Sequence, residues 1–451
     1  MSKSKQLDMV NGPLAGRIIL YALPIAATAI LQQLFNAADV AVVGQLVGAP
    51  AMAAVGANSS VISLIVNMFV GFSLGANVVI ATAIGSNDYE TVHKAVHTSI
   101  LVSLIAGIIA AILGELAVGP IVSVLGVPSD VLSMATIYLR IYFIGIPVII
   151  LYNFEASFFR SMGDTKTPLI VLTISGIINV ILNLFFVAIL KRNVDGVAMA
   201  TLISNVFSCI VLLIILSKTS LEIRIRKDEF RIDKKTLIKI MKIGVPAGLQ
   251  NAVFSIANIV IQSAINSLGT IVMAASSAAF NIEVFAYDVI NSFSQSCTTF
   301  VGQNNGAGKI NRCKKVLIVC YVEAALTTAL SVFLILLFGE EILSIFNSDP
   351  KVISIGYIRL VYIFTAYIFT MQYELMSGYL RGFGISTLPS ILTTVGIVGV
   401  RLGFIFFVFP MNRTFQTIMM TYPASLATTA VLLYIAAFIT RPAKKRIQEI
   451  S

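Results

Sequence analysis

Long apolar segments separated by short polar loops recur along the whole of this chain. An α-helix needs about 20 predominantly apolar residues to cross the hydrocarbon core of a bilayer. By that criterion the pattern predicts an all-α polytopic membrane protein with twelve transmembrane helices. The predicted helices cover approximately residues 15–43, 51–85, 94–118, 131–159, 168–190, 194–217, 237–266, 270–302, 314–338, 352–378, 387–409 and 414–440.

The predicted helices form two copies of one unit. The stretch FFRSMGDTKTPLI at 158–170 reappears as YLRGFGISTLPSI at 379–391, and both fit aromatic-x-R-x-x-G-x-x-x-x-P. Six helices per copy is an even number, so both copies have the same orientation, related by an axis along the membrane normal. The sequence therefore predicts two pseudo-symmetric six-helix lobes, at 1–217 and 237–451, joined by a cytoplasmic linker at 218–236. Duplicated bundles of this kind bind substrates between their halves, near the bilayer midplane.

Composition and charge agree with a membrane protein. Hydrophobic residues make up 57% of the 451 and charged residues 12%, against about 25% charged in a soluble domain. The formal net charge is +10, but most of the 31 Lys and Arg fall at the N-terminus, in loops after even-numbered helices and in the C-terminal tail. This asymmetry predicts that both termini are cytoplasmic. The positive charge indicates topology and an affinity for anionic lipids, and we expect no nucleic-acid partner.

Motifs of several function classes do not occur in the sequence. There is no GxxxxGK[ST] motif and no soluble segment long enough to hold a nucleotide, so ATP-driven pumping by this chain alone is not expected. The four cysteines form no CxxC. His93 and His97 are spaced i,i+4 without an HExxH motif, so we expect them to have an interfacial structural role. We therefore expect a protein that is not an enzyme and that uses no cofactor besides a coupling ion.

Polar residues within the first six predicted helices indicate a cation site. A charge at a helix centre costs about 2.5–3.5 kcal/mol on insertion scales, so it usually faces a cavity or a partner. One carboxylate, at Asp39, with nearby carbonyl and hydroxyl oxygens suits a proton or Na⁺, and burial favours its protonated form. The alternative is polar contact between helices. The candidate cation-coupling residues are Gln32, Asn36 and Asp39 on one face of the first helix, Asn179 and Asn183 in the fifth, and Thr201 in the sixth.

A second set of polar and aromatic residues indicates a site for an organic cation. Carboxylates would neutralise its charge, and aromatic rings would provide stacking and cation–π contacts. The alternative interpretation of Glu283 and Glu374 is a helix–helix hydrogen bond or an ion pair with Arg359 or Arg401. The candidate substrate-binding residues are Asn258, Glu283, Tyr287 and Glu374 in the second half, with Asn153 and Glu155 in the first.

The duplicated twelve-helix plan resembles the multidrug and toxic compound extrusion (MATE) transporters of prokaryotes. The resemblance rests on ADVAVVGQLVG at 38–48, on the IGSND and GQNNGAG loops after the second and eighth helices, and on the paired R-x-x-G-x-x-x-x-P loops. It covers essentially the whole chain. It implies two six-helix lobes forming a V, alternating access, and efflux of small cationic drug-like substrates in exchange for H⁺ or Na⁺. We accordingly expect a monomer that spans the plasma membrane of a prokaryote many times.

The resemblance extends to the candidate cation site with one departure. Asp39 matches the first-helix aspartate that many prokaryotic members use, and Asn179 and Thr201 match polar residues of the fifth and sixth helices. The fifth helix of the family often reads N-x-x-x-D, whereas this chain has Asn183 in place of the acid. One proton suffices to neutralise a single carboxylate, so H⁺ is favoured over Na⁺, for which Asp39 is the candidate ligand. Pro24 resembles the proline at which the first helix of some members bends.

A lipid or lipid-linked oligosaccharide flippase of related architecture is the alternative function. Its anionic substrate would require basic groups in the cavity, whereas the charges within the predicted helices are mostly acidic. A channel would need a lined pore, usually from oligomer symmetry, while a two-lobe repeat favours rocking around one site. The sequence therefore predicts a secondary active multidrug antiporter that exports organic cations.

Overall fold

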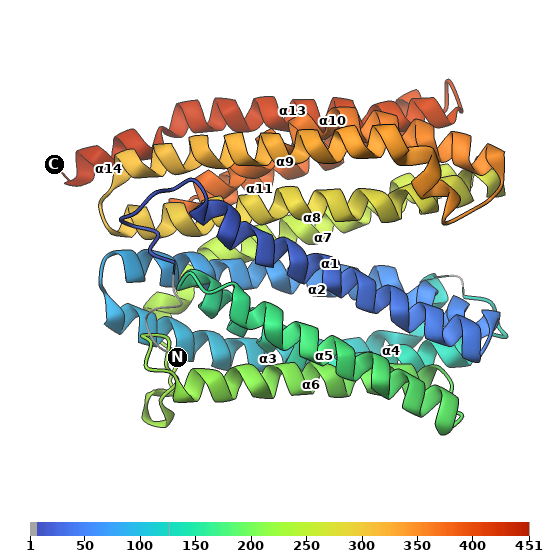
Figure 1. The fold of residues 1–451 in the computed structure, drawn as a ribbon, viewed down its shortest axis with the longest axis horizontal. Helices are drawn as coiled ribbons and strands as arrows, with labels where there is room; N and C mark the ends of the chain where they lie inside the picture. Colours follow the sequence, from blue (N-terminus) through green and yellow to red (C-terminus); the bar gives the residue numbers. More distant parts are fainter. Residues whose placement is uncertain (1–6, 126, 451) are drawn as a thin grey trace. The chain divides into compact units, whose positions relative to one another are not determined.

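The computed structural model describes residues 7–125 and 127–450, and within them every regular element is helical (Figure 1). In that part of the chain twelve helices are long and apolar enough to cross a membrane, which confirms the predicted number. Residues 1–6, part of the predicted cytoplasmic N-terminus, lie outside the described residues. The elements are α1 (Arg17–Leu46), α2 (Ala49–Gly85), α3 (Tyr89–Val124), α4 (Leu132–Ser161), α5 (Lys166–Leu184), η2 (Phe185–Ile189), α6 (Val194–Lys218), η3 (Lys227–Glu229), α7 (Lys234–Asn266), α8 (Thr270–Gly306), α9 (Ile310–Ser344), α10 (Pro350–Gly382), α11 (Thr387–Thr393), η4 (Thr394–Gly399), α12 (Val400–Gly403), η5 (Phe404–Val408), α13 (Phe415–Thr440) and α14 (Pro442–Ile450).

The duplicated motif marks the points at which one helix ends and the next begins. Gly163 and Gly384 follow α4 and α10 with positive φ angles of 86° and 79°, which glycine adopts without steric cost. Each glycine N–H donates to the carbonyl of the motif arginine, at 3.0 and 2.8 Å respectively. Pro168 and Pro389 lie in the first turns of α5 and α11, where a helix has no use for the missing N–H. The motif is therefore a helix stop followed by a helix start.

The described helices fall into two compact units. The first contains residues 27–244 and is built around α4, which packs against α2, α3 and α6. The second contains residues 8–26 and 245–450 and is built around α10, which packs against α8, α9 and α13. Because α4 and α10 are the fourth membrane helices of the two predicted halves, the internal packing of each unit reflects the sequence duplication.

The unit boundaries do not coincide with the predicted division at 218–236. Residues 8–26, which include the start of α1, belong to the second unit, while the linker and the start of α7 as far as Gly244 belong to the first. Pro24 and Pro246 each lie within three residues of the point at which α1 or α7 passes from one unit to the other. Each unit is therefore completed by the first turns of a helix that continues in the other.

These exchanged helix starts are held by close contacts. In the second unit, the Tyr21 hydroxyl donates to Thr299 Oγ1 at 3.2 Å, and its ring centroid lies 5.6 Å from that of Phe300. In the first unit, a Cβ placed on Gly75 of α2 would lie 2.3 Å from the carbonyl oxygen of Ile240 in α7. The α2 and α7 backbones thus touch, as small residues allow between membrane helices.

The linker between α6 and α7 packs onto the first unit. Leu221 and Ile223 are buried in the hydrophobic core of that unit. The backbone N–H of Arg226 donates to His97 Nε2 at 2.9 Å, and that of Asp233 donates to Thr98 Oγ1 at 3.0 Å. The segment is therefore docked along the start of α3.

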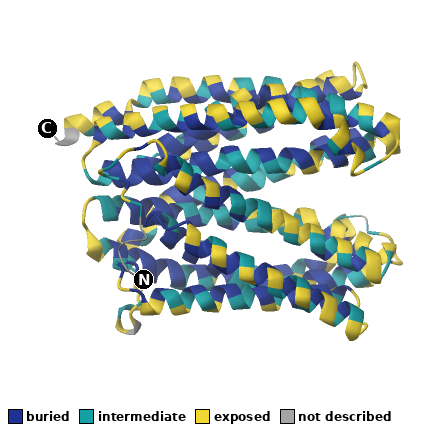
Figure 2. Ribbon diagram, in the orientation of Figure 1, coloured by how far each residue is buried: buried dark blue, intermediate teal, exposed yellow. Residues whose placement is uncertain are grey.

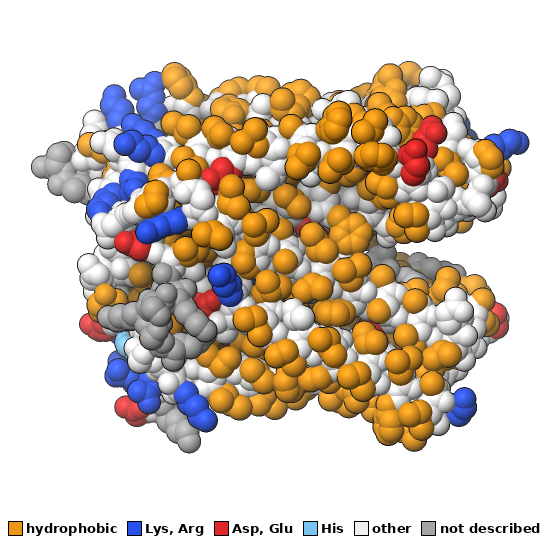
Figure 3. All heavy atoms as spheres, in the orientation of Figure 1, with side chains coloured by type: hydrophobic (Ala, Val, Ile, Leu, Met, Phe, Trp, Pro, Cys, Tyr) orange, Lys and Arg blue, Asp and Glu red, His pale blue; other side chains and the backbone are white. Residues whose placement is uncertain are grey.

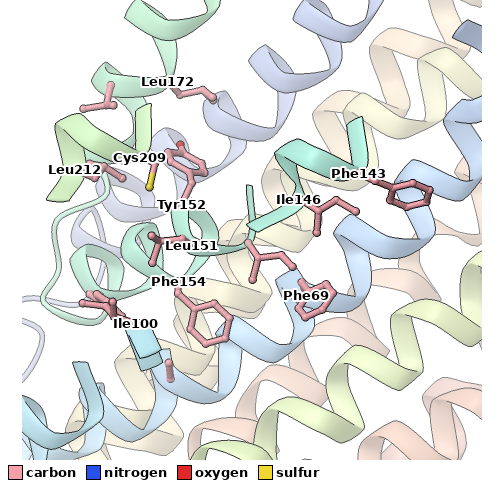
Figure 4. Packing of buried hydrophobic residues seen from close by; sticks show 14 of the residues in the cluster. Phe69, Ile100, Phe143, Ile146, Leu151, Tyr152, Phe154, Leu172, Cys209 and Leu212 are labelled. Carbon is pink, nitrogen blue, oxygen red and sulfur yellow. The ribbon is translucent and has the colours of Figure 1, made fainter. Parts of the chain in front are cut away.

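Apolar residues form both the interior and the outer surface of the helices. In the first unit, Phe69 of α2 and Leu151 and Phe154 of α4 meet in a buried cluster (Figure 4). On the outside, α9 has exposed positions along its length (Figure 2). The large exposed side chains among them are apolar and form a stripe. Figure 3 shows hydrophobic side chains covering the visible flanks of the helices, with Lys and Arg gathered near their ends. A surface of this kind is compatible with lipid as the surrounding solvent. The α9 stripe consists of Ile318, Val322, Leu326, Leu330, Phe333 and Leu337.

Candidate functional site

Asp39 lies in a buried cluster with three of the residues predicted to accompany it. Asn183 Nδ2 of α5 donates to Asp39 Oδ1 at 2.5 Å, and Thr201 Oγ1 of α6 donates to Asp39 Oδ2 at 3.0 Å. The second amide hydrogen of Asn183 reaches Asn179 Oδ1 at 3.2 Å, and Asn179 Nδ2 reaches Thr201 Oγ1 at 3.4 Å. The i,i+4 spacing of the two asparagines places both on the face of α5 that meets α6 and α1.

The Asp39 cluster has one formal charge and no counter-ion. Among the described residues no Lys, Arg or His forms an ion pair with Asp39. The side chain is 5% exposed, and amide and hydroxyl groups donate to its two oxygens. Asn183 Oδ1 is buried with no hydrogen-bond partner in the described part of the chain, so one acceptor oxygen remains available beside the carboxylate. This arrangement can accept a single positive charge.

The structure does not bring Gln32 and Asn36 into this cluster. Both side chains are exposed, and neither bonds to the cluster in the described residues. The contact of α1 with α5 runs through Phe35, whose ring lies against Gly176, and through Asp39 one turn later. The middle of α1 makes few close contacts with other helices. Of the polar face formed by Gln32, Asn36 and Asp39, only Asp39 is therefore buried.

Two tyrosines near the Asp39 cluster were not predicted. Tyr138 and Tyr142 of α4 lie close enough to Asp39 to interact with it electrostatically. Tyr138 belongs to the Tyr-x-Arg sequence that occurs upstream of both copies of the duplicated motif, so a signal for it was present. The i,i+4 spacing of the two tyrosines on one helix face would have added the second.

Glu155 and Asn153 do not form an open substrate site in the first unit. Glu155 is completely buried, and one of its oxygens accepts from Cys209 Sγ at 3.6 Å while the other has no partner among the described residues. The Asn153 amide donates to the carbonyl of Ile149 in its own helix at 2.8 Å. Glu155 lies where α4 packs against α6, so this structure does not place its carboxyl at an open ligand site.

The second unit contains a cavity with ≈ 660 Å³ of empty space, including the part open to the surroundings. Small-molecule sites are mostly apolar with a few convergent polar groups, and the lining of this cavity has that character. Three predicted residues, Asn258, Glu283 and Tyr287, line it. The other lining residues are Phe254, Phe280, Val284, Arg359, Ile363, Tyr367, Thr370, Tyr373, Arg401, Tyr422 and Leu426.

Glu283 is not a free carboxylate in this cavity. Arg359 donates to it twice, from Nε to Oε1 at 2.5 Å and from Nη2 to Oε2 at 2.8 Å, which is a forked ion pair. The remaining guanidinium nitrogen, Nη1, donates to Ser276 Oγ at 2.5 Å. The structure therefore matches the alternative left open by the sequence, a helix–helix ion pair, and removes the basis for a cation held by Glu283.

Glu374 is similarly engaged but does not line the cavity. Its Oε1 accepts from the Tyr287 hydroxyl at 2.9 Å, and its backbone carbonyl accepts from Ser294 Oγ at 2.8 Å. Tyr287 thus stands between the carboxylate and the cavity. The prediction that Glu374 contacts substrate directly does not fit this geometry, because the tyrosine covers the acid.

Arg401 is a cavity residue whose role the sequence did not indicate. It is 2% exposed and lies in α12, with its guanidinium carbon 5.1 Å from the ring centroid of Phe254 and 4.6 Å from that of Tyr422. Nη1 donates to Asn258 Oδ1 at 3.0 Å, and Nε donates to Ser425 Oγ at 3.3 Å. A basic residue within an apolar predicted helix was the signal that could have identified it.

The two histidines lie beside the linker at the start of α3. His97 is buried, with one ring nitrogen 2.7 Å from the His93 carbonyl and the other bonded to the backbone of Arg226. His93 Nδ1 lies 3.6 Å from Glu229 in η3. The three side chains could come together around a metal, but both nitrogens of His97 are already occupied by backbone groups.

Comparison with protein families assigns the chain. The model of the MatE family matches it twice, at residues 24–185 and 246–407. The chain belongs to the MatE family. The two matches begin at Pro24 and Pro246 and together cover well over half of the sequence. Each runs from the first to the fifth membrane helix of one repeat and ends before the sixth.

Curated relatives in the MatE family carry transporter names. The probable multidrug resistance protein YoeA of Bacillus subtilis is 25% identical over 423 residues, covering 92% of this chain and 91% of the relative. The probable multidrug resistance protein NorM of Thermotoga maritima is 27% identical over 389 residues, covering 85% and 83%. The similarity therefore extends over nearly the full length of both proteins.

A solved structure shares the MatE fold. It is that of a MOP superfamily transporter from Pyrococcus furiosus, described as having a binding pocket of reverse polarity. Its TM-score is 0.90, with 22% sequence identity, and the alignment covers 98% of this chain and 99% of that chain. At this identity the likeness shows the fold, and it confirms the MATE-like arrangement of twelve helices predicted from the sequence.

Proposed function

We propose that this MatE family member is a secondary active exporter that moves drug-like organic molecules by alternating access, in exchange for a cation bound at Asp39. The observation that carries the proposal is the buried Asp39 carboxylate, which has polar partners on α5 and α6 but no basic partner among the described residues. The names of the multidrug resistance relatives support export of organic molecules. A buried acid without a counter-ion is stabilised in a conformation that lets a cation reach it. The cation then binds the two conformations of the transporter with different affinities, which coupling requires.

We propose H⁺ as the coupling ion because the cluster can take a proton without losing a hydrogen bond. Thr201 Oγ1 has two possible acceptors for its one hydrogen, Asp39 Oδ2 at 3.0 Å and the Val197 carbonyl at 3.0 Å. A proton on Oδ2 would be donated to Thr201 Oγ1, whose own hydrogen would then go to Val197. The rest of the cluster, including the bond from Asn183 to Oδ1, would be unchanged.

Na⁺ would require a larger rearrangement at the same site. It needs several oxygen ligands, and the amide nitrogen of Asn183 now faces the carboxylate. Asn183 Oδ1 is the unpartnered oxygen that could turn towards an ion, and Asn179 Oδ1 and Thr201 Oγ1 could add two more. A proton would therefore leave the Asn183 amide in place, whereas Na⁺ would require the amide to turn its oxygen towards the ion. The two ions can be distinguished by their dependence on Asn183.

The proposal is tested in proteoliposomes loaded with a fluorescent drug and subjected to a pH difference in Na⁺-free medium. Wild-type protein should exchange the drug, and Asp39→Asn should not, while remaining monodisperse. Glu115→Gln is the matched control, because Glu115 is an exposed acid whose partner Arg140 lies 3.2 Å away. Normal pH-driven exchange by Asp39→Asn would reject Asp39 as the coupling site.

The choice of ion has its own outcome. Exchange that depends strictly on a Na⁺ gradient and ignores the pH difference would replace H⁺ by Na⁺. In that case Asn183→Ala should lower the apparent affinity for Na⁺, because it removes an amide oxygen ligand. With H⁺ as the ion, the same variant should still exchange drug in response to a pH difference.

The flippase alternative gains one observation from the structure. An anionic headgroup requires a basic residue in the cavity, and Arg401 lines the cavity of the second unit. Vesicles that contain a fluorescent anionic lipid separate the two functions. Gradient-dependent dye export without lipid translocation supports the exporter, and lipid translocation without dye export supports the flippase.

A further inference from the structure

The cavity of the second unit contains more positive than negative charge. Its charged lining residues are Arg359, Arg401 and Glu283, so the formal sum is two positive charges and one negative, or +1. Arg359 and Glu283 neutralise each other in the forked pair described above. The charge that remains belongs to Arg401.

The hydrogen-bond and ring partners of Arg401 are uncharged, and the acid Glu283 acts on it through space without a direct contact. It donates to a neutral amide and a neutral hydroxyl, on Asn258 and Ser425, and it lies over the rings of Phe254 and Tyr422. Among the described residues no carboxylate forms an ion pair with it. In the described part of the chain no hydrogen bond uses its Nη2 group. A buried guanidinium of this kind is costly unless it meets an anion, and cation–π contacts offset only part of that cost.

The backbone that carries Arg401 is irregular on both sides. α12 is four residues long and is flanked by two π-helical segments, η4 and η5. π-helical segments are rare and occur frequently at functional sites. Gly396 in η4 also lies so close to α13 that a Cβ would be 2.3 Å from Thr429 Oγ1. The arginine is therefore held at a fixed position against α13 by a distorted, tightly packed helix.

The rest of the cavity suits a flat apolar body. Phe280, Tyr287, Tyr367 and Tyr373 line it together with the two rings beside Arg401. Aromatic walls of this kind stack on planar ligands and place few demands on their substituents. The single fixed charge then sets the preferred charge of the ligand.

We propose that this cavity binds an aromatic organic anion, with the anionic group against Arg401 and the ring system among the aromatic side chains. The inference deepens the proposed export function, on which its biological meaning rests, and it reverses the ligand charge that the sequence predicted. An organic cation in the same place would meet an unpaired guanidinium, while the one lining acid that could attract it is already bound to Arg359.

The experiment compares two dyes that share a three-ring xanthene skeleton but differ in charge. Fluorescence anisotropy measures binding of fluorescein, an anion, and rhodamine 123, a cation, to purified protein in nanodiscs of zwitterionic phosphatidylcholine. Wild-type protein should bind fluorescein more tightly. Arg401→Gln should weaken fluorescein binding about tenfold or more, the usual effect of losing a charged hydrogen bond, and leave rhodamine 123 unchanged or tighter. Arg401→Lys should retain part of the preference.

Arg413→Gln is the matched control, because Arg413 also lies over a ring, that of Phe409 at 5.7 Å, but is exposed and outside the cavity. It should bind both dyes as the wild type does. If Arg401→Gln is not monodisperse, the wild-type preference between the two dyes and the Arg401→Lys variant carry the test. Equal fluorescein binding by wild type and Arg401→Gln, or tighter wild-type binding of rhodamine 123, would overturn the proposal.

Two further measurements distinguish an aromatic ligand from a lipid phosphate, and the ligand assignment from the export function. Fluorescein binding that is competed away in phosphatidylglycerol nanodiscs, together with no binding of other aromatic anions, would assign Arg401 to a lipid phosphate and overturn the aromatic ligand. Asp39→Asn should abolish pH-driven transport while leaving fluorescein binding intact. If transport fails in the wild type but the dye preference holds, the export function is wrong and the ligand assignment stands. If transport succeeds only for cations and Arg401→Gln changes nothing, the ligand assignment is wrong and export stands.

Discussion

Replacing Glu283 with glutamine should destabilise the protein strongly, because it leaves the charge of Arg359 buried and unpaired. The side chains of Glu283 and Arg359 are 8% and 3% exposed, and two charged hydrogen bonds of 2.5 and 2.8 Å join them. At an effective dielectric constant of about 20, unit charges at this separation attract with roughly 6 kcal/mol before desolvation is counted. Removing one partner of such a pair costs about 3–5 kcal/mol, whereas an exposed pair contributes about 0–1 kcal/mol.

A thiol-reactive dye provides the assay for this prediction. All four cysteines are buried, so the dye reports unfolding as the protein is heated in detergent. Glu283→Gln should unfold at a clearly lower temperature than the wild type. Glu115→Gln, which breaks an exposed pair with Arg140, should unfold close to the wild-type temperature. The double variant Glu283→Leu with Arg359→Met should recover much of the loss, because no uncompensated charge remains.

One result would refute this reasoning. If Glu283→Gln unfolds with the wild type and instead weakens the binding of rhodamine 123, Glu283 is a substrate carboxylate as the sequence suggested. The ion pair would then be dispensable for stability, and the charge assigned to the cavity would have to be reversed.

Three other outcomes are expected. Cysteines at Ser220 and Ser348, both exposed, should react from opposite sides of intact cells; reaction of both with an impermeant reagent would contradict the predicted topology. Gly75→Ala should lower the unfolding temperature, since overpacking at a backbone contact typically costs about 1–3 kcal/mol, and an unchanged temperature would show that α2 and α7 can separate. Asp88→Ala should cost about 1 kcal/mol as a lost N-cap of α3, measured by the same thermal assay. Hydrogen bonds from Thr91 hold the pKa of Asp88 below its ordinary value of 3.8, so this contribution is present above that value and is lost as pH falls through the lower folded pKa; a loss centred at neutral pH would contradict it.

The architecture could be predicted from the sequence because length and hydropathy alone decide whether a helix can cross a membrane. The twelve helices lie where the apolar segments predicted them. Several continue past the apolar part, as α3 does by extending over 89–124 against a predicted 94–118. At its N-terminal end, α3 is stabilised by the cap at Asp88 and by contacts with the linker. An analysis of hydropathy alone does not detect either contribution.

The candidate sites were predicted in part, and the misses have a common cause. The Asp39 cluster was found because spacing along a helix fixes which residues share a face, and α5 and α6 are adjacent. The pairing of Glu283 was left undecided, because the choice between Arg359 and Arg401 depends on how α10 and α12 rotate against α8. The unpaired state of Arg401 follows from that choice. The sequence shows which charged residues are available to a cavity. The charge that a ligand meets there depends on which of these residues form ion pairs with each other.

The exchange of helix starts between the two units has a consequence for biosynthesis. When the ribosome has released the first six helices, the first unit still lacks residues 234–244, which pack against Gly75. The second unit, by contrast, takes residues 8–26 from the earliest part of the chain to be made. Neither unit can complete its packing until part of the other half of the chain has been inserted. A cut within the linker would therefore yield two incomplete fragments that need each other to fold, although every helix of the repeat is present in both.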